Sequence, residues 1–160
     1  MAGLWALGPH FIAFTSSFAL VSVFWLAHMS ILRTLRVFDW RVAVMNLVFL
    51  FTITLMPFAA ALLGEHGGAG IVWRIYCLAL IAASIGQTLL LITVANAPNH
   101  LTAREFWYRT VRALSPGAAF AVGFTLNLLG YPILSYASPA LILVIFLIAR
   151  LALGPRRARA

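Results

Sequence analysis

Long apolar stretches without charge constrain this chain more than any other feature. The first charged residue is Arg33, and several later stretches are also long enough for the roughly 20 apolar residues that cross a bilayer core. Hydrophobic residues make up 64% of the chain and charged residues 9%, whereas a soluble domain has about a quarter of its residues charged. We therefore expect an integral membrane protein with a single transmembrane domain over residues 1–160, because spans on this scale leave no room for a soluble domain.

Five spans are predicted, and all should be helices. Hydrocarbon offers backbone polar groups no partner outside a helix or a closed barrel, and these stretches lack the alternation of a barrel strand. The expected fold class is therefore an all-α integral membrane protein with five transmembrane helices, in which Pro57 introduces a tolerable kink into the second span. The spans are placed at residues 4–32, 42–63, 75–95, 116–134 and 139–153, followed by a basic cytoplasmic tail at 154–160.

The N-terminus and the single cysteine add little to this outline. No basic segment precedes the first apolar stretch, which is also too long for the core of a cleavable signal peptide, so no signal peptide is expected. Cys77 falls inside the third span and has no second cysteine with which to form an intramolecular disulfide. We interpret it as a small packing residue.

The arginines predict the orientation in the membrane. The connections after the first and third spans and the C-terminal tail are basic, so by the positive-inside rule they are cytoplasmic. Five spans with the tail inside place the N-terminus outside. The net charge of +8 is then interpreted as topology and contact with anionic headgroups, not as a nucleic-acid surface. The topology-setting residues are Arg33, Arg36, Arg41, Arg104, Arg109, Arg112, Arg156, Arg157 and Arg159.

The third connection also carries three consecutive aromatic residues, at positions 106–108. Aromatic and basic residues together are typical of a helix that lies in the membrane interface. We therefore expect a short interfacial helix on the cytoplasmic leaflet in this connection.

His28 is the most informative polar residue, because it lies near the end of a span that is otherwise hydrocarbon. Trp25 shares its helix face. His28 and Asn46 lie nine positions on either side of the first connection, so an antiparallel hairpin places them at similar depth and predicts a hydrogen bond between them. Such a pair is either simple glue between helices or part of an ion pathway, and the residues alone leave both interpretations open.

Three further span residues, Thr52, Gln87 and Asn127, are candidates for pore lining or for helix packing, of which packing is the more common role. His10 and His28 lie near opposite ends of one span, as haem ligands can, but His66 and His100 fall in connections and provide no facing ligand. No span carries a carboxylate, so no catalytic or metal site is predicted.

The first hairpin resembles a known family. Residues 17–39 read SFALVSVFWLAHMSILRTLRVFD, and residues 40–68 read WRVAVMNLVFLFTITLMPFAAALLGEHGG. Together they are similar to the second and third helices of the transmembrane protein 175 family of potassium channels in its prokaryotic form. The matching elements are Ser17-Phe18, Phe24-Trp25, His28, Arg33, Asp39, Asn46-Leu47, Phe49-Leu50, Pro57-Phe58, Leu62-Leu63 and Gly64-Glu65. The resemblance covers residues 1 to 65, and the later spans fit by topology alone.

The resemblance also implies a difference. Family members of this kind have six helices with both ends inside, and they form tetramers around a pore lined by the first helix, which carries a Phe-Ser-Asp signature. This sequence has no such tripeptide, and its only aspartate is Asp39. We therefore expect that the family's first helix is missing, which agrees with an N-terminus outside. Either the start codon is set too far downstream or the protein is a five-helix variant.

The resemblance implies a subunit of a potassium-selective leak channel in the cell membrane. Its partners would be potassium ions, membrane lipid and further copies in a homo-tetramer, without a cofactor or enzymatic activity. Trp25, His28 and Asn46 would support the pore-lining helix as a polar bracket. The alternative is a non-conducting membrane scaffold or accessory subunit.

Overall fold

A computed structural model of the chain describes residues 8–35, 38–66, 69–96 and 101–154. Every regular element within these ranges is a helix, which confirms the all-α membrane class. The helices are α2 (Gly8–Leu32), α3 (Trp40–Thr54), α4 (Met56–His66), α5 (Gly70–Asn96), α6 (Ala103–Leu128), α7 (Pro132–Ala137) and α8 (Ala140–Leu153).

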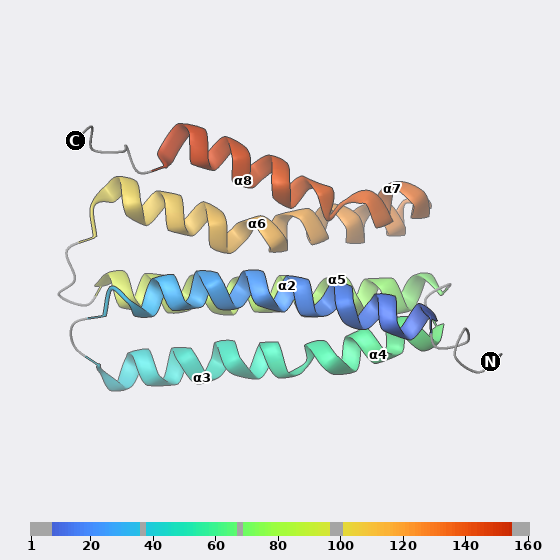
Figure 1. Cartoon of the computed structure of the whole chain (residues 1–160), viewed down its shortest axis with the longest axis horizontal. Coiled ribbons are helices and arrows are strands. Elements are labelled where there is room, and N and C mark those ends of the chain that lie inside the picture. The colour runs from blue at the N-terminus through green and yellow to red at the C-terminus, as the bar shows by residue number, and fades with distance from the viewer. Residues whose placement is uncertain (1–7, 36–37, 67–68, 97–100, 155–160) are drawn as a thin grey trace.

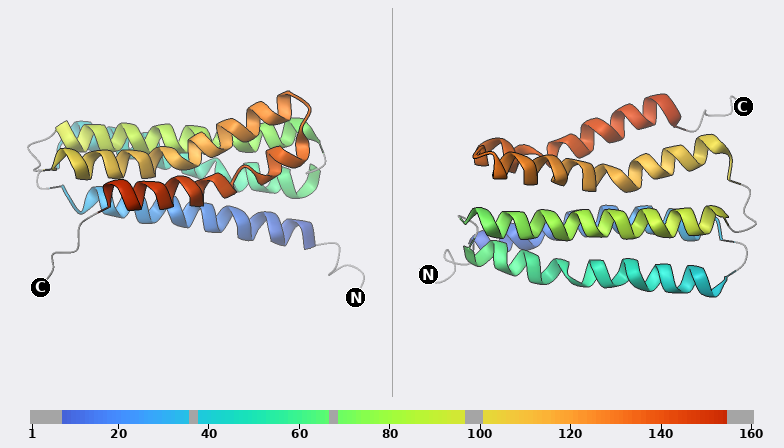
Figure 2. Two further views of the ribbon diagram at one scale, coloured as in Figure 1. Left: turned by 90° about the horizontal axis from the view of Figure 1, so that it is seen from above. Right: turned by 180° about the vertical axis from the view of Figure 1, so that it is seen from behind.

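The long helices lie side by side along one axis and alternate in direction (Figures 1 and 2). α2 runs one way, α3 and α4 together return, and α5 and α6 repeat the pattern. Gly130, at φ +83°, turns the chain after α6 into the short α7, and α8 then runs back along α6. α8 consequently ends at the opposite end of the bundle from the start of α2, as an odd number of passes requires.

Three helical segments of the described chain are long and apolar enough to cross a membrane, namely Phe14–Leu32, Trp40–His66 and Gly70–Asn96. The shorter apolar helix Ala140–Leu153 accompanies them. The protein is therefore a multi-pass membrane protein. The full map of five spans stays a prediction.

α5 is the central helix of the bundle. It contacts α2, α3, α4 and α6, and its side chains Leu80, Leu90 and Leu91 have no exposed surface. Small residues allow the close approach: a Cβ on Gly86 would lie 3.3 Å from the Cα of Phe49 in α3. Small residues at such contacts are what membrane helices use to bring backbones together.

Proline produces the two irregularities that the structure shows inside long helices. The second span divides at Leu55, between α3 and α4, because Pro57 lacks an N–H and its ring crowds the carbonyl of Ile53. The predicted kink is confirmed. In α6, Pro116 withdraws a donor from the carbonyl of Arg112, and the Ser115 hydroxyl donates to that carbonyl at 3.0 Å instead.

α6 begins well before the predicted start of the fourth span at residue 116. A capping box starts it: the Thr102 hydroxyl accepts from the Glu105 backbone N–H at 3.3 Å, and the Glu105 carboxylate accepts from the Thr102 backbone N–H at 3.1 Å. The aromatic residues 106–108 therefore belong to the first turns of α6 and not to a separate interfacial helix. The expectation of a separate helix was wrong. The basic residues of the connection led us to start the fourth span at residue 116, whereas the helix continues through them.

A first prediction concerns the contact of α5 with α6. A Cβ added to Gly117 would lie 2.6 Å from the Cβ of Ser84, so Gly117→Ala should lower the free energy of unfolding by about 1–3 kcal/mol through overpacking. Gly8→Ala is the matched control, because its added Cβ meets nothing within 4 Å. Thermal unfolding in detergent checks both variants, and equal midpoints for the two would contradict the close approach.

Candidate functional site: a polar cluster between α2 and α3

The imidazole of His28 lies in an aromatic cluster where α2 faces α3. Its ring stacks on that of Phe49, with centroids 4.9 Å apart and planes at 24°. The Trp25 ring lies one turn earlier on α2, with its centroid 5.7 Å from that of His28. His28 is 3% exposed and Phe49 1%, whereas Trp25 is 54% exposed. His28 is therefore held by ring contacts inside the bundle, while Trp25 faces outward.

Asn46 lies one helical turn before Phe49 on α3, and its depth relative to His28 stays a prediction. The hydrogen bond predicted between them is wrong. His28 Nδ1 and Asn46 Oδ1 are both buried, and neither has a hydrogen-bond partner in the described part of the chain. The stacked Phe49 ring takes the place of polar contact with His28.

Unpartnered buried polar atoms are costly, at about 1–3 kcal/mol each. The described residues contain a third such atom, Ser138 Oγ, in the turn between α7 and α8. His28 and Asn46 differ from it because they belong to two different helices, α2 and α3. The His28 ring nitrogen can donate or accept a hydrogen bond, and Asn46 Oδ1 can accept one. This cluster of Trp25, His28, Asn46 and Phe49 is the candidate site, and we call it the His28 cluster.

The other three predicted polar residues, Gln87, Thr52 and Asn127, make contacts outside the His28 cluster or within their own helix. Gln87 is 1% exposed, and its Nε2 donates to the Phe24 backbone carbonyl at 2.8 Å. The Thr52 hydroxyl donates to Phe49 O of its own helix at 2.6 Å. The Asn127 side chain lies against Gly70 at the start of α5. These contacts favour helix packing over pore lining for all three residues.

Sequence reasoning missed two polar links that hold α5 in place. The Gly117 backbone N–H donates to the Ser84 hydroxyl at 2.7 Å, and the Ser17 and Tyr76 hydroxyls lie 3.0 Å apart. Gly117 follows Pro116, and that pair marks an interrupted helix ladder in which a neighbouring serine can accept the freed N–H. The Ser17–Tyr76 contact has no comparable signal, because it joins residues 59 positions apart.

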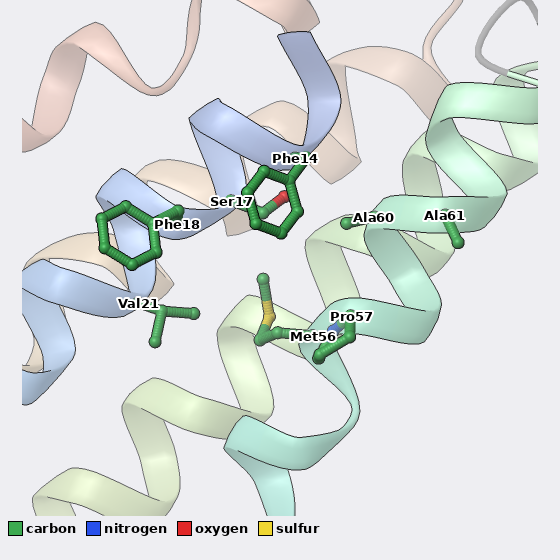
Figure 3. Close-up of a pocket in the computed structure, with 8 residues that line it drawn as sticks. All are labelled: Phe14, Ser17, Phe18, Val21, Met56, Pro57, Ala60 and Ala61. Carbon is green, nitrogen blue, oxygen red and sulfur yellow. The ribbon is translucent and has the colours of Figure 1, made fainter. Parts of the chain in front are cut away.

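A groove of about 370 Å³ lies between α2 and α4, and its walls are almost wholly apolar (Figure 3). Its one hydroxyl, that of Ser17, is the one paired with Tyr76. The groove therefore offers no group for acid–base or nucleophilic chemistry. Its lining comprises Phe14, Ser17, Phe18 and Val21 from α2 and Met56, Pro57, Ala60 and Ala61 from α4.

All but one of the arginines named from the described chain lie at one end of the bundle. Arg33 follows α2, Arg41 begins α3, and Arg104, Arg109 and Arg112 lie in the first turns of α6, at the end where α8 finishes. Arg74 lies at the opposite end, in the first turns of α5. Arg36, Arg156, Arg157 and Arg159 lie outside the described residues, as do His100 and the side chain of His10.

Comparison with protein families adds to this geometry. Residues 1–57 match the family model of the endosomal/lysosomal potassium channel TMEM175, a stretch that contains α2, α3 and the whole His28 cluster. No curated protein matches the chain. The family match supports a role as a potassium channel, that is, as a transporter and not an enzyme. Such a role implies contact with potassium ions and membrane lipid. The match over residues 1–57 confirms the resemblance of the first hairpin to the TMEM175 potassium channel family.

Proposed function

We propose that the chain is a subunit of a homo-oligomeric, potassium-selective leak channel in the cell membrane, and that the His28 cluster braces the helix that lines its pore. Potassium would pass down its electrochemical gradient without a cofactor. The family match over residues 1–57 supports the channel role. The single observation that carries the bracing role is the pair of buried polar atoms, His28 Nδ1 and Asn46 Oδ1, that no described residue satisfies.

The bracing role follows from what hydrocarbon does to polar groups. A polar atom inside a membrane protein is retained against its cost when a partner or a function requires it. Asn46 Oδ1 can accept a hydrogen bond from a hydroxyl on a further helix, and the His28 ring can accept from a hydroxyl or donate to a carboxylate there. A helix with a Ser-Asp pair, such as the one that the family resemblance implies, carries both kinds of group.

The interior of the described bundle supports a pore formed by assembly and not by one chain. Gln87 and Thr52 are the two candidates for lining a path through one chain. Both side chains donate hydrogen bonds to backbone carbonyls. A potassium pathway needs polar lining that replaces hydration. Large apolar side chains that could face neighbouring copies or lipid are exposed on α2, among them Phe11, Phe14 and Phe18.

The use of Gln87 and Thr52 for helix packing also favours the second candidate, a non-conducting scaffold or accessory subunit. A bundle in which Gln87 and Thr52 serve helix packing does not require a pore. Conduction measurements separate the two functions.

A second prediction therefore concerns flux. Residues 1–160 in liposomes should pass little potassium, because the five predicted spans provide neither a ring of carboxylates nor a filter-like loop. The same chain preceded by a helix that carries the Phe-Ser-Asp signature should pass potassium well above sodium. Selective flux from residues 1–160 alone would overturn the need for a further helix, and absence of flux from both would favour the scaffold.

A third prediction separates stability from function at His28. In His28→Phe the benzyl ring can keep the stacking on Phe49, while the unpartnered nitrogen disappears. We expect the unfolding midpoint of residues 1–160 to stay the same or rise, while potassium flux of the helix-extended channel falls at least tenfold.

Thr54→Val is the matched control, because the Thr54 hydroxyl is exposed and bonds only within its own helix, to Phe51 O at 2.7 Å. Both stability and flux should stay near those of the parent protein. A His28→Phe protein with unchanged flux would show that the His28 cluster does not support the pore.

A fourth prediction concerns orientation. Because arginines are concentrated at the end where α8 finishes, we expect that end to face the cytoplasm by the positive-inside rule. A reporter fused after Ala160 should therefore be cytoplasmic, and a reporter inserted at residues 64–70 should be outside. Both reporters on the same side would contradict an odd number of crossings between them.

A further inference from the structure

α2 and α8 finish and α6 begins at the same end of the bundle (Figure 2). A pocket of about 280 Å³ with three arginines in its lining lies there. Apart from Ser30, its lining residues are remote in sequence from the His28 cluster, and the pocket plays no part in the proposed conduction. Its lining consists of Ser30, Thr102, Arg104, Glu105, Tyr108, Arg109, Arg112 and Leu153.

The charge of the pocket is unbalanced. Arg104, Arg109 and Arg112 contribute three positive charges, and Glu105 contributes one negative charge. Hydrogen bonds from the backbone N–H and hydroxyl of Thr102 hold the pKa of Glu105 below its ordinary value, so its carboxylate stays ionised and is committed to Thr102. Within the described residues, none of the three arginines lies within 4.0 Å of a carboxylate oxygen. The pocket is therefore cationic, because Glu105, which also interacts electrostatically with Arg109, offsets only one of its three positive charges.

Two of the arginines are positioned by helix ends. Arg109 Nη1 donates to the Ser30 carbonyl near the end of α2, and Arg104 Nη2 donates to the Ala152 carbonyl near the end of α8 at 3.3 Å. Each bond uses one of the five N–H groups of a guanidinium. The remaining donors are free to bind an anion, and the two side chains are already ordered for that purpose.

The third arginine is held by aromatic rings. The Arg112 guanidinium lies 5.7 Å from the centroid of the Tyr108 ring and 5.2 Å from that of the Phe146 ring. Such cation–π contacts fix its position but do not neutralise its charge. Arg112 is therefore the most available charge in the pocket, because no hydrogen bond to another helix engages it among the contacts described here.

We propose that this pocket binds the phosphate of an anionic phospholipid in the adjoining leaflet. A planar guanidinium matches phosphate oxygens with two parallel hydrogen bonds, and basic pockets between membrane helices bind lipid headgroups. The two helices that supply most of the lining also carry apolar surface for the acyl chains, since Trp107 of α6 and Leu147 and Leu151 of α8 are more than half exposed. Inorganic phosphate has no apolar part that could pack against that surface.

Native mass spectrometry of residues 1–160 in detergent tests the proposal, with dioleoyl phosphatidylglycerol as the anionic probe and dioleoyl phosphatidylcholine as the zwitterionic one. Phosphatidylglycerol should bind preferentially at a single site. Arg112→Gln should weaken that site about fivefold, the equivalent of roughly 1 kcal/mol for one basic side chain near a membrane surface. Arg112→Lys should restore only part of the affinity, because lysine keeps the charge without the planar fork.

Arg41→Gln is the matched control. It removes the same charge at the same end of the bundle, on α3 and outside the pocket. We expect its affinity for phosphatidylglycerol to equal that of the parent protein. Equal losses in the Arg41 and Arg112 variants, or no preference for phosphatidylglycerol over phosphatidylcholine, would overturn the pocket as a headgroup site.

Inorganic phosphate distinguishes the two sources of the anion. Added at millimolar concentration, it should displace phosphatidylglycerol only weakly, because it lacks the apolar contacts. Phosphate that binds at the pocket as tightly as the lipid would identify a soluble anion and overturn the lipid as its occupant. Arg104→Gln provides a second variant if Arg112→Gln does not fold, and it too should weaken phosphatidylglycerol binding while leaving α2 tied to α6 through Arg109.

Discussion

The scarcity of partners inside a membrane governs this structure. Hydrocarbon cannot bond to a polar group, so each one must find its partner in the protein or remain unsatisfied. α5 shows how the bundle meets this requirement: Gln87 donates to the carbonyl of Phe24, Ser84 accepts from the backbone of Gly117, and Tyr76 pairs with Ser17. These bonds join α5 to α2 and α6, and apolar packing alone would not specify those contacts so closely.

Against that background the His28 cluster is an exception. Its ring contacts are complete, but two of its polar atoms have no partner among the described residues. A site that departs from the rule followed by the rest of the interior is where function is expected. Gln87 offers a contrast, because the N–H of this buried carboxamide does find a carbonyl in the same bundle. The exception therefore does not reflect a general inability of this fold to satisfy buried polar groups.

The sequence predicted the class of fold, the break at Pro57 and the level at which His28 meets α3. Each follows from a one-dimensional quantity: apolar length, the missing N–H of proline, or distance from a connection. The hydrogen bond to Asn46 failed because lateral position is not such a quantity. α2 packs along α4 and α5, while α3 packs along α5, and the Phe49 ring occupies the space beside His28. The start of α6 was also missed, although the Thr102–Glu105 capping box was present in the sequence.

The arginine-rich end links topology to packing. In the positive-inside rule an arginine is only a charge at the end of a span, yet Arg109 and Arg104 also satisfy carbonyls at the ends of α2 and α8. Those carbonyls carry the negative end of the helix dipole and lack partners within their own helices. The same side chains thus join α6 to two neighbouring helices, and by the positive-inside rule they are also expected to orient the chain. Neutralising Arg104 or Arg109 should therefore change the charge at this end of the chain, the contact between helices and the charge of the pocket. Neutralising Arg112, which the aromatic rings hold, should change chiefly the charge of the pocket.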